Sequence, residues 1–299
     1  MKNINNEPVN LIYRRIAKRL NKNNFYDFMD YYELTYNEML GIIDYAIRGN
    51  FLTLLQTTAL KELLEKMRVL VKFNDSKLGV ISDLHIGNIA ENFDYINRAF
   101  NLFSDNGITS VICLGDLLDG YSEIERKRIS NDNLMADICY KQILDFALKY
   151  PEGMNTYTIL GNHEDKFETV GLDVWKLIDL YRKDFHMLGY GASYIDFNGA
   201  IFYLEHPVKC SRMIPPKYDY DLLLKGHSHF FKYREELNAL SITTCSDVRT
   251  AYGRIDSLME PGCAIISNLG DSYQVEGYAF LDDKSEKVLN ITKKKNIKT

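Results

Sequence analysis

Residues 78–85 read LGVISDLH, an apolar run that is followed at once by an aspartate and a histidine two positions apart. A short apolar run bounded by polar residues is typical of a strand that is buried in a sheet. Residues 110–114 and 157–160 form two further runs of this kind. Helical spacing is found beside them, at about residues 90–106, 122–149 and 172–182. Strands that alternate with amphipathic helices predict βαβ units and an α/β fold.

The strand pattern continues in the second half of the chain. Residues 201–204 and 221–224 are further candidate strands, and Asn198-Gly199 before the first of them predicts a hairpin turn of type I′. After residue 229 the spacing becomes strand-rich, with candidates at residues 232–237, 240–244, 264–267, 273–281 and 287–291. This spacing indicates a second, largely antiparallel set of strands.

Three regions follow from these patterns. The first seventy or so residues are rich in good helix formers, which predicts a small helical region over residues 1–74. The strands and helices described above predict one main domain over residues 75–292. The basic residues near the end predict a solvated tail over residues 293–299.

Composition excludes several classes of protein. With 46% hydrophobic and 26% charged residues, the chain can bury a substantial core and is neither disordered nor fibrous. The net charge of -5 gives no general basic signature for nucleic-acid binding. Five scattered cysteines without a Cys-x-x-Cys pair argue against a disulfide framework or a zinc ribbon. The polar first ten residues and the absence of long apolar runs lead us to expect a cytoplasmic protein without a membrane partner.

Polar motifs follow five of the predicted strands. They contain Asp83 and His85; Asp116 and Asp119; Asn162, His163 and Glu164; His206; and His227 and His229. In an open α/β sheet, groups beyond the carboxyl ends of the strands converge on one crevice. Two residues that are two positions apart in extended backbone point the same way, so each such pair can bind one metal. The neighbours Asn162 and His163 must point differently, which suits one ligand and one group aimed at a substrate.

The types of side chain in these motifs indicate a metal centre. Five of the six histidines lie in the motifs, and only His186 lies elsewhere. Nitrogen and oxygen ligands without cysteine suit Mn²⁺, Zn²⁺ or Fe, and a shared carboxylate can bridge two ions that lie roughly 3.5–4 Å apart. Asp116 is the natural bridge between two such ions.

The ordered set Asp-x-His, Gly-Asp-x-x-Asp, Gly-Asn-His-Glu, His and Gly-His-x-His resembles the calcineurin-like metallophosphoesterase superfamily. It covers the chain from about residue 79 to residue 229. The resemblance implies a four-layer α/β/β/α sandwich of two packed mixed sheets, with residues 75–292 as the catalytic domain. It also implies a metal-dependent phosphoric ester hydrolase whose substrate is a phosphate monoester or diester.

The resemblance further implies the role of each residue in the motifs. One metal would be bound by Asp83, His85, Asp116 and His229, and the other by Asp116, Asn162, His206 and His227. We expect two divalent ions per chain, with Mn²⁺ as the metal and Zn²⁺, Fe or Ni²⁺ as alternatives. A hydroxide that bridges the metals would attack phosphorus in line. His163 would protonate the leaving oxygen as general acid, and Asp119 would hold its imidazole.

Departures from particular branches narrow the resemblance. Asp119 is followed by Gly120-Tyr121 and His206 by Pro207, unlike the corresponding motifs of protein Ser/Thr phosphatases. Asp119 also stands where purple acid phosphatases have a tyrosine ligand. The sequence is therefore similar to the branch of phosphodiesterases, nucleases and small phosphatases.

Other interpretations of these residues stay open at this point. His186 is an alternative to His206, and Asp119 is equally well explained as the cap of the helix after it. A second function class is a binding scaffold that has the fold but has lost the activity. A third interpretation is a nuclease that contacts DNA through a basic N-terminal helix, against which stands a solvated helix packed on the main domain. The basic residues of that helix are Arg14, Arg15, Lys18, Arg19 and Lys22.

Overall fold

The computed structural model describes most of the chain after residue 70. Described are residues 71–121, 132–207, 220–247, 260–281 and 284–296, together with isolated residues between positions 16 and 58. Among the latter, Ile16, Ile42, Ile43 and Ala46 are helical and buried. Of the predicted basic face, Lys18 and Arg19 are helical and exposed, whereas Arg14, Arg15 and Lys22 lie outside the described residues.

The larger of two sheets has seven strands in the order β13-β12-β11-β2-β3-β4-β5. Its strands are β2 (Lys77–Ile81), β3 (Ser110–Cys113), β4 (Asn155–Leu160), β5 (Phe185–Tyr190), β11 (Gly262–Asn268), β12 (Ser272–Leu281) and β13 (Lys284–Lys294). Strands β2 to β5 are parallel, whereas β11, β12 and β13 are added in antiparallel fashion beside β2. The parallel part is the βαβ core that the sequence predicts.

The smaller sheet has six strands in the order β1-β6-β7-β8-β10-β9. Its strands are β1 (Val71–Phe73), β6 (Ala192–Phe197), β7 (Ala200–Glu205), β8 (Leu222–Lys225), β9 (Lys232–Arg234) and β10 (Ala239–Ser241), with the short 3₁₀ helix η1 (Glu235–Leu237) between the last two. Asn198 and Gly199 join β6 to β7 with positive φ at both positions, which confirms the predicted type I′ hairpin.

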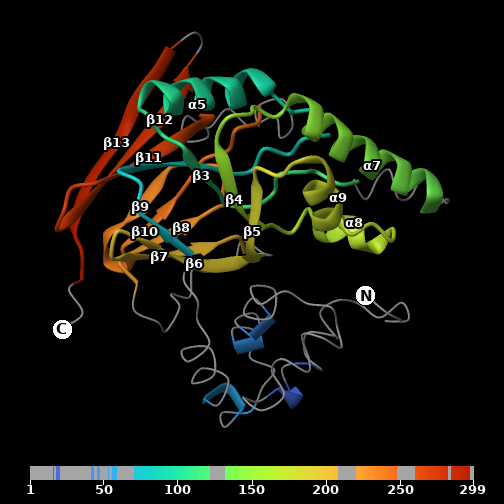
Figure 1. Cartoon of the computed structure of the whole chain (residues 1–299), viewed down its shortest axis with the longest axis horizontal. Helices are drawn as coiled ribbons and strands as arrows, with labels where there is room; N and C mark the ends of the chain where they lie inside the picture. Colours follow the sequence, from blue (N-terminus) through green and yellow to red (C-terminus); the bar gives the residue numbers. More distant parts are fainter. Residues whose placement is uncertain are drawn as a thin grey trace.

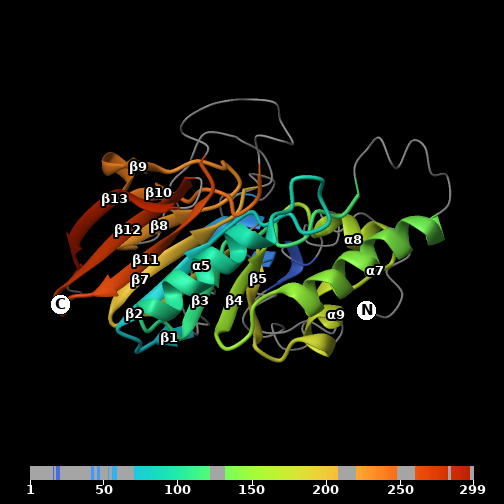
Figure 2. The same ribbon diagram turned by 90° about the horizontal axis from the view of Figure 1, so that it is seen from above.

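Helices cover the face of the larger sheet that is turned away from the smaller one (Figures 1 and 2). They are α5 (Phe93–Asp105), α7 (Asp132–Lys149), α8 (Asp165–Thr169) and α9 (Val174–Tyr181). Helix α5 begins where the side chain of Asn92 accepts hydrogen bonds from the next backbone amides. The α/β class and the two packed mixed sheets are thereby confirmed. Together with the two sheets, the described helices make three layers, so the described residues contain three of the four predicted layers.

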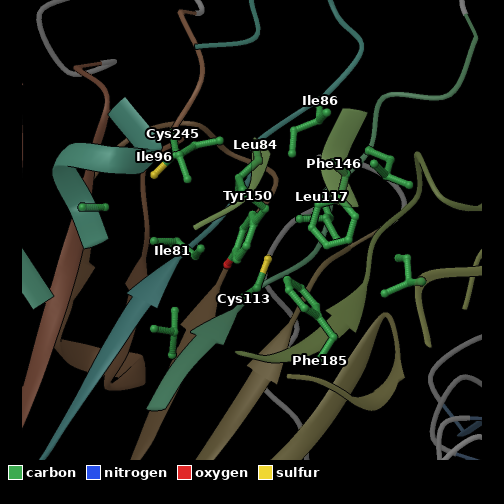
Figure 3. Packing of buried hydrophobic residues seen from close by; sticks show 14 of the residues in the cluster. Ile81, Leu84, Ile86, Ile96, Cys113, Leu117, Phe146, Tyr150, Phe185 and Cys245 are labelled. Atoms are coloured by element: carbon green, nitrogen blue, oxygen red, sulfur yellow. The ribbon is translucent and has the colours of Figure 1, made fainter. Parts of the chain in front are cut away.

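Two hydrophobic clusters join these layers. Figure 3 shows part of the first cluster, in which Phe146 of α7 and the nearby Tyr150 each lie within 5 Å of the Phe185 ring of β5. The second cluster fills the space between the sheets, with Leu78 of β2 and Phe202 of β7 among its members. Because β2 is buried on both faces, it reads as a continuous apolar run. Each fully buried side chain of this size stabilises the fold by about 1.5–3 kcal/mol.

Some predicted elements differ from the structure. The strands after residue 229 do not form a separate set: β9 and β10 extend the smaller sheet, where β10 is parallel to β8, and β11 to β13 extend the larger one. The predicted tail is partly ordered, because β13 continues to Lys294 and Lys295 donates to the backbone oxygen of Asn198. The last residues of the predicted helical region form a strand, since β1 starts at Val71 and pairs with β6. None of the described helices combines the length and the apolar character that a membrane span needs.

Arg182, at the end of α9, links three elements and yields the first testable prediction. Its buried guanidinium donates to the carbonyl oxygens of Tyr150 and Pro151 and forms a bidentate pair with Asp184. Arg182→Met should lower the free energy of unfolding by about 3 kcal/mol, because it leaves these acceptors without a charged donor. Urea denaturation measures the change.

Lys183 provides the matched control for Arg182. It forms an ion pair with Asp179 at 3.0 Å, but both side chains are more than half exposed. Lys183→Met should therefore cost less than about 1 kcal/mol. Equal losses for the two variants would contradict the role of Arg182 as a buried link.

Candidate metal centre

The predicted ligands all lie just beyond the carboxyl ends of strands. Asp83 and His85 follow β2, Asp116 follows β3 and Asn162 follows β4 in the larger sheet. In the smaller sheet His206 follows β7 directly, and His227 and His229 follow β8. Both sheets therefore contribute to one site, as their packing face to face requires.

The backbone around these ligands has an uncommon conformation. Among the described residues, positive φ angles outside glycine are confined to seven positions, and five of them are predicted ligands. These five are Asp83, His85, Asp116, His227 and His229. The expectation that each Asp-x-His or His-x-His pair lies in extended backbone is thus wrong, because the strands have already ended. Left-handed backbone is sparsely populated by such residues, and its concentration at one place is typical of a functional site.

The first group of ligand atoms is formed by Asp83, His85 and His229. The Nε2 atom of His229 lies 3.1 Å from Oδ1 of Asp83 and 3.1 Å from Nε2 of His85. The three ligand atoms lie within 4.8 Å of one another. Asp116 stands beside this group, with its Oδ2 atom 3.9 Å from Nε2 of His85.

The second group is formed by Asp116, His206 and His227, whose ligand atoms also lie within 4.8 Å of one another. The Nε2 atom of His206 is 3.1 Å from Oδ2 of Asp116. Asp116 is therefore adjacent to both groups, which is the position that a bridging carboxylate must have. His186, the alternative to His206, lies elsewhere on β5, where it pairs with the side chain of Asn155.

The hydrogen bonds of His206 test whether a metal fits these residues. Its Nδ1 atom donates to the carbonyl oxygen of Leu114 at 2.6 Å, which turns Nε2 toward Asp116. This buried Nε2 atom and the buried Oδ1 atom of Asn162 have no hydrogen-bond partner among the described residues. A ring nitrogen and a carboxylate oxygen that face each other at 3.1 Å need a proton or a cation between them. The donor set thus fits a divalent cation bound by nitrogen and oxygen.

Electrostatic interactions in the site favour positive charge. Burial alone would lower the pKa of His206, but the carboxylates of Asp116 and Asp83 raise it to about 10. Burial would raise the pKa of Asp83, yet His229 and His206 lower it to about 2. The pKa of Asp116 also falls far below its ordinary range, against the effect of burial, because His206 lies beside it. Two buried carboxylates therefore stay ionised and stabilise a cation at this position.

His163 lies beside the two groups and is oriented differently. Its Nδ1 atom is 2.9 Å from both the carboxylate Oδ1 and the backbone oxygen of Asp119, and its Nε2 atom is 3.9 Å from Oδ2 of Asp116. Burial would lower the pKa of His163, but the hydrogen bond with Asp119 raises it. Asp119 thus contacts the imidazole as expected, while the start of the helix that it was alternatively expected to cap lies outside the described residues.

Glu164 is a further candidate site residue, for which no role is predicted from the sequence. Its buried carboxylate accepts hydrogen bonds from the backbone amides of Asp116, Leu118 and Gly161. It thereby joins the loop after β3 to the turn after β4. Burial and the charge of Asp116 raise its pKa to about 7, although the amides of Leu118 and Gly161 act in the opposite direction. Its place in the Gly-Asn-His-Glu motif indicates that Glu164 lies near the site, but the motif alone does not predict which groups it contacts.

The turn after β4 requires glycine at position 161. A Cβ atom there would lie 2.2 Å from Oδ1 of Asp116 and 2.5 Å from its backbone nitrogen. Only a residue without a side chain lets the two ligand loops approach this closely. The glycine before Asn162 is thus explained by packing against the bridging residue.

Two packed mixed sheets with histidine, aspartate and asparagine ligands at their carboxyl ends define an α/β protein with a candidate dinuclear metal centre. The family model of the calcineurin-like phosphoesterases matches residues 76–231, which is more than half of the chain. The chain belongs to the calcineurin-like phosphoesterase family, as its motifs predict. This family is one of phosphoester hydrolases that bind divalent metals.

Several solved structures are similar to the chain at low identity. Vps29 from Entamoeba histolytica in complex with Zn²⁺ is 15% identical, with 72% of this chain and 98% of that chain covered and a TM-score of 0.40. YfcE, a phosphoesterase from E. coli, is 15% identical, with coverage of 72% and 98% and a TM-score of 0.42. A predicted phosphoesterase from Streptococcus pneumoniae is 12% identical, with coverage of 73% and 98% and a TM-score of 0.35. No curated protein sequence matches the chain significantly.

The hydrogen bonds of Glu164 yield the second testable prediction. Glu164→Gln keeps the size of the side chain but turns an amide group toward backbone N–H groups that need an acceptor. The loop that carries Asp116 should lose its fixed position, and the affinity for Mn²⁺ should fall about 10–100-fold, as is usual when a group that supports metal ligands is removed. Isothermal titration calorimetry with Mn²⁺ measures this change in affinity. Glu286→Gln on the exposed strand β13 is the control, and equal affinities of the two variants would refute the support role.

Proposed function

We propose that the chain is a dinuclear metal-dependent phosphoesterase that hydrolyses a phosphate monoester or diester. The observation that carries this proposal is the convergence of nitrogen and oxygen atoms from the four loops after β2, β3, β7 and β8, with separations as short as 3.1 Å. Such an arrangement needs protons or cations between the facing atoms, and divalent cations fit this set of donors. Membership in the calcineurin-like phosphoesterase family supports the same reaction class.

The two groups of side chains define how the cations would be held. Asp83, His85, Asp116 and His229 are the proposed ligands of one ion, and Asp116, Asn162, His206 and His227 those of the other. Two divalent ions supply an activated water and stabilise the charge on the phosphoryl oxygens when they are bound. Mn²⁺ is the metal that we propose, because carboxylate, amide and imidazole ligands without thiolate suit it; Zn²⁺, Fe and Ni²⁺ are the alternatives.

His163 is the proposed general acid. Its Nδ1 atom is anchored on Asp119, which leaves Nε2 directed toward the space beside Asp116. The hydrogen bond with Asp119 raises the pKa of His163 against the effect of burial, which favours the protonated imidazole. A leaving oxygen next to Nε2 can then receive that proton as the bond to phosphorus breaks.

Metal-dependent turnover tests the proposed function directly. The full chain should bind close to two ions by elemental analysis and hydrolyse bis(p-nitrophenyl) phosphate or p-nitrophenyl phosphate with Mn²⁺, with EDTA abolishing the activity. Parallel assays with single-stranded and duplex DNA address the nuclease alternative. Two bound ions without turnover of any of these esters would favour a scaffold that has lost the activity, and no bound ion would refute the metal centre.

The bridging position of Asp116 yields the third testable prediction. Asp116→Asn should weaken both metal sites together, because its carboxylate stands beside both groups of ligands. Asn162→Ala is the matched variant, and it should lower the stoichiometry toward one ion by removing a ligand of the second site alone. Elemental analysis of both variants after dialysis measures this difference. Loss of only one ion from Asp116→Asn would contradict the bridge.

The position of His163 yields the fourth testable prediction. His163→Ala should retain both ions and lower the turnover of a phenyl phosphate ester by about 10²–10⁴-fold, the usual contribution of general acid catalysis. The loss should be smaller for the p-nitrophenyl counterpart, because p-nitrophenolate leaves readily without a proton. Equal losses for both esters, or loss of metal, would show that His163 has another role.

A further inference from the structure

Gln142 is a buried polar residue of α7 that belongs to none of the sequence motifs. Its side-chain amide forms two hydrogen bonds with the backbone of Gly120: Oε1 accepts from the N–H group at 2.8 Å, and Nε2 donates to the carbonyl oxygen at 2.6 Å. A helix on the face of the larger sheet is thereby tied to the loop that follows Asp119. No predicted metal ligand makes these contacts.

The first of these hydrogen bonds acts on a peptide group that also contacts His163. The N–H group of Gly120 and the carbonyl group of Asp119 belong to one planar peptide unit and point in opposite directions. On the far side of this unit, the Asp119 carbonyl oxygen lies 2.9 Å from Nδ1 of His163 and 2.8 Å from Nζ of Lys166, which donates to it. The peptide group that Gln142 holds is therefore one of the groups that orient the imidazole, together with the Asp119 carboxylate and Lys166 Nζ, which lie 2.9 Å and 3.0 Å from Nδ1.

Gly120 itself cannot fix the orientation of this peptide unit. It has a φ of 70°, in the left-handed region, and a glycine has the widest choice of backbone angles. The second hydrogen bond, from Nε2 of Gln142 to the Gly120 carbonyl oxygen, fixes the following peptide unit as well. The two peptide groups that flank Gly120 are thus held by one side chain.

The glutamine is also closely packed, so that its amide has little freedom to turn. A Cβ atom at Gly87 would lie 2.2 Å from Cδ of Gln142, which places the side chain directly against the loop after His85. The loops after β2 and β3 are paired beside it, with the Asp119 amide donating to the carbonyl oxygen of Ile86. Gln142 therefore contacts both loops next to Asp119, the residue that contacts His163.

We infer that Gln142 is a positioning residue for the reaction, which acts through the Asp119–Gly120 peptide group to hold the imidazole of His163 toward the leaving group. The inference rests on the proposed function, because it assigns a partner to the proposed general acid. A purely structural glutamine would stabilise α7 without any effect that depends on the leaving group.

Gln142→Met tests this inference in the full chain, because methionine keeps the length of the side chain but neither donates nor accepts a strong hydrogen bond. Two ions should remain bound. Turnover of the phenyl ester should fall about 10–100-fold through misplacement of the imidazole, with a smaller loss for the p-nitrophenyl ester. Gln142→Glu loses the group that donates to the Gly120 carbonyl oxygen. It should likewise lower turnover of the phenyl ester more than turnover of the p-nitrophenyl ester. Ile143→Val is the control on the same helix, since its side chain lies in the hydrophobic cluster, and it should leave both rates unchanged.

The double variant Gln142→Met with His163→Ala separates positioning from a structural effect. If Gln142 acts through His163, adding Gln142→Met to His163→Ala should cause no further loss with the phenyl ester. The same fold loss in both backgrounds, or a Gln142→Met enzyme with the wild-type ratio of phenyl to p-nitrophenyl rates, would overturn the inference while the proposed function stands. A wild-type chain without metal-dependent turnover would overturn the proposed function and this inference together.

Discussion

The structure depends on the burial of two ionised carboxylates, Asp83 and Asp116, among imidazole rings. Burying a carboxylate costs several kcal/mol unless a partner of opposite charge compensates it. The nearby ring nitrogens are acceptors as often as donors, and two of them, in His85 and His229, lie 3.1 Å apart. Cations held between these atoms would compensate the buried carboxylates and the facing ring nitrogens at once, which is the charge balance that the proposed metal centre supplies.

The fold brings these charges together through the ends of strands from two sheets. Tight packing between the sheets, with Leu78 and Phe202 in the shared cluster, fixes the strands themselves. Beyond their ends the backbone turns into left-handed conformations, which the surrounding hydrogen bonds must hold. The Thr244 hydroxyl donates to the carbonyl oxygen of Asp83, and the amide of His85 donates to that of Asp116. These hydrogen bonds hold the loops that carry the predicted ligands in place at the ends of the strands.

The sequence predicts the βαβ core, the hairpin at Asn198 and the order of the ligand motifs, because these depend on local periodicity and on residue types at strand ends. It does not predict β5, where a half-buried histidine and a glycine interrupt the apolar run, or the parallel pairing of β10 with β8. It also predicts extended backbone at Asp83 and His85, where φ is positive. The hydrogen-bond partners of Glu164 are also not predicted. They are backbone amides, two of which are distant in the sequence, and every residue except proline has such an amide, so no residue type indicates them.

The loop from Asp116 to Gly120 carries the proposed bridging ligand at one end and contacts His163 near the other. Different side chains hold these two parts of the loop. At the start of the loop, the carboxylate of Glu164 accepts hydrogen bonds from the backbone amides of Asp116 and Leu118. These hydrogen bonds fix the position of the proposed bridging ligand. At its other end the amide of Gln142 holds Gly120 and, through the shared peptide group, the contact between Asp119 and His163. A carboxylate suits the first end because backbone donors converge there, and a primary amide suits the second because one N–H and one C=O group must be held together. One short loop can therefore carry both the proposed bridging ligand Asp116 and the residue that contacts His163, Asp119, while each end of the loop keeps its own anchor.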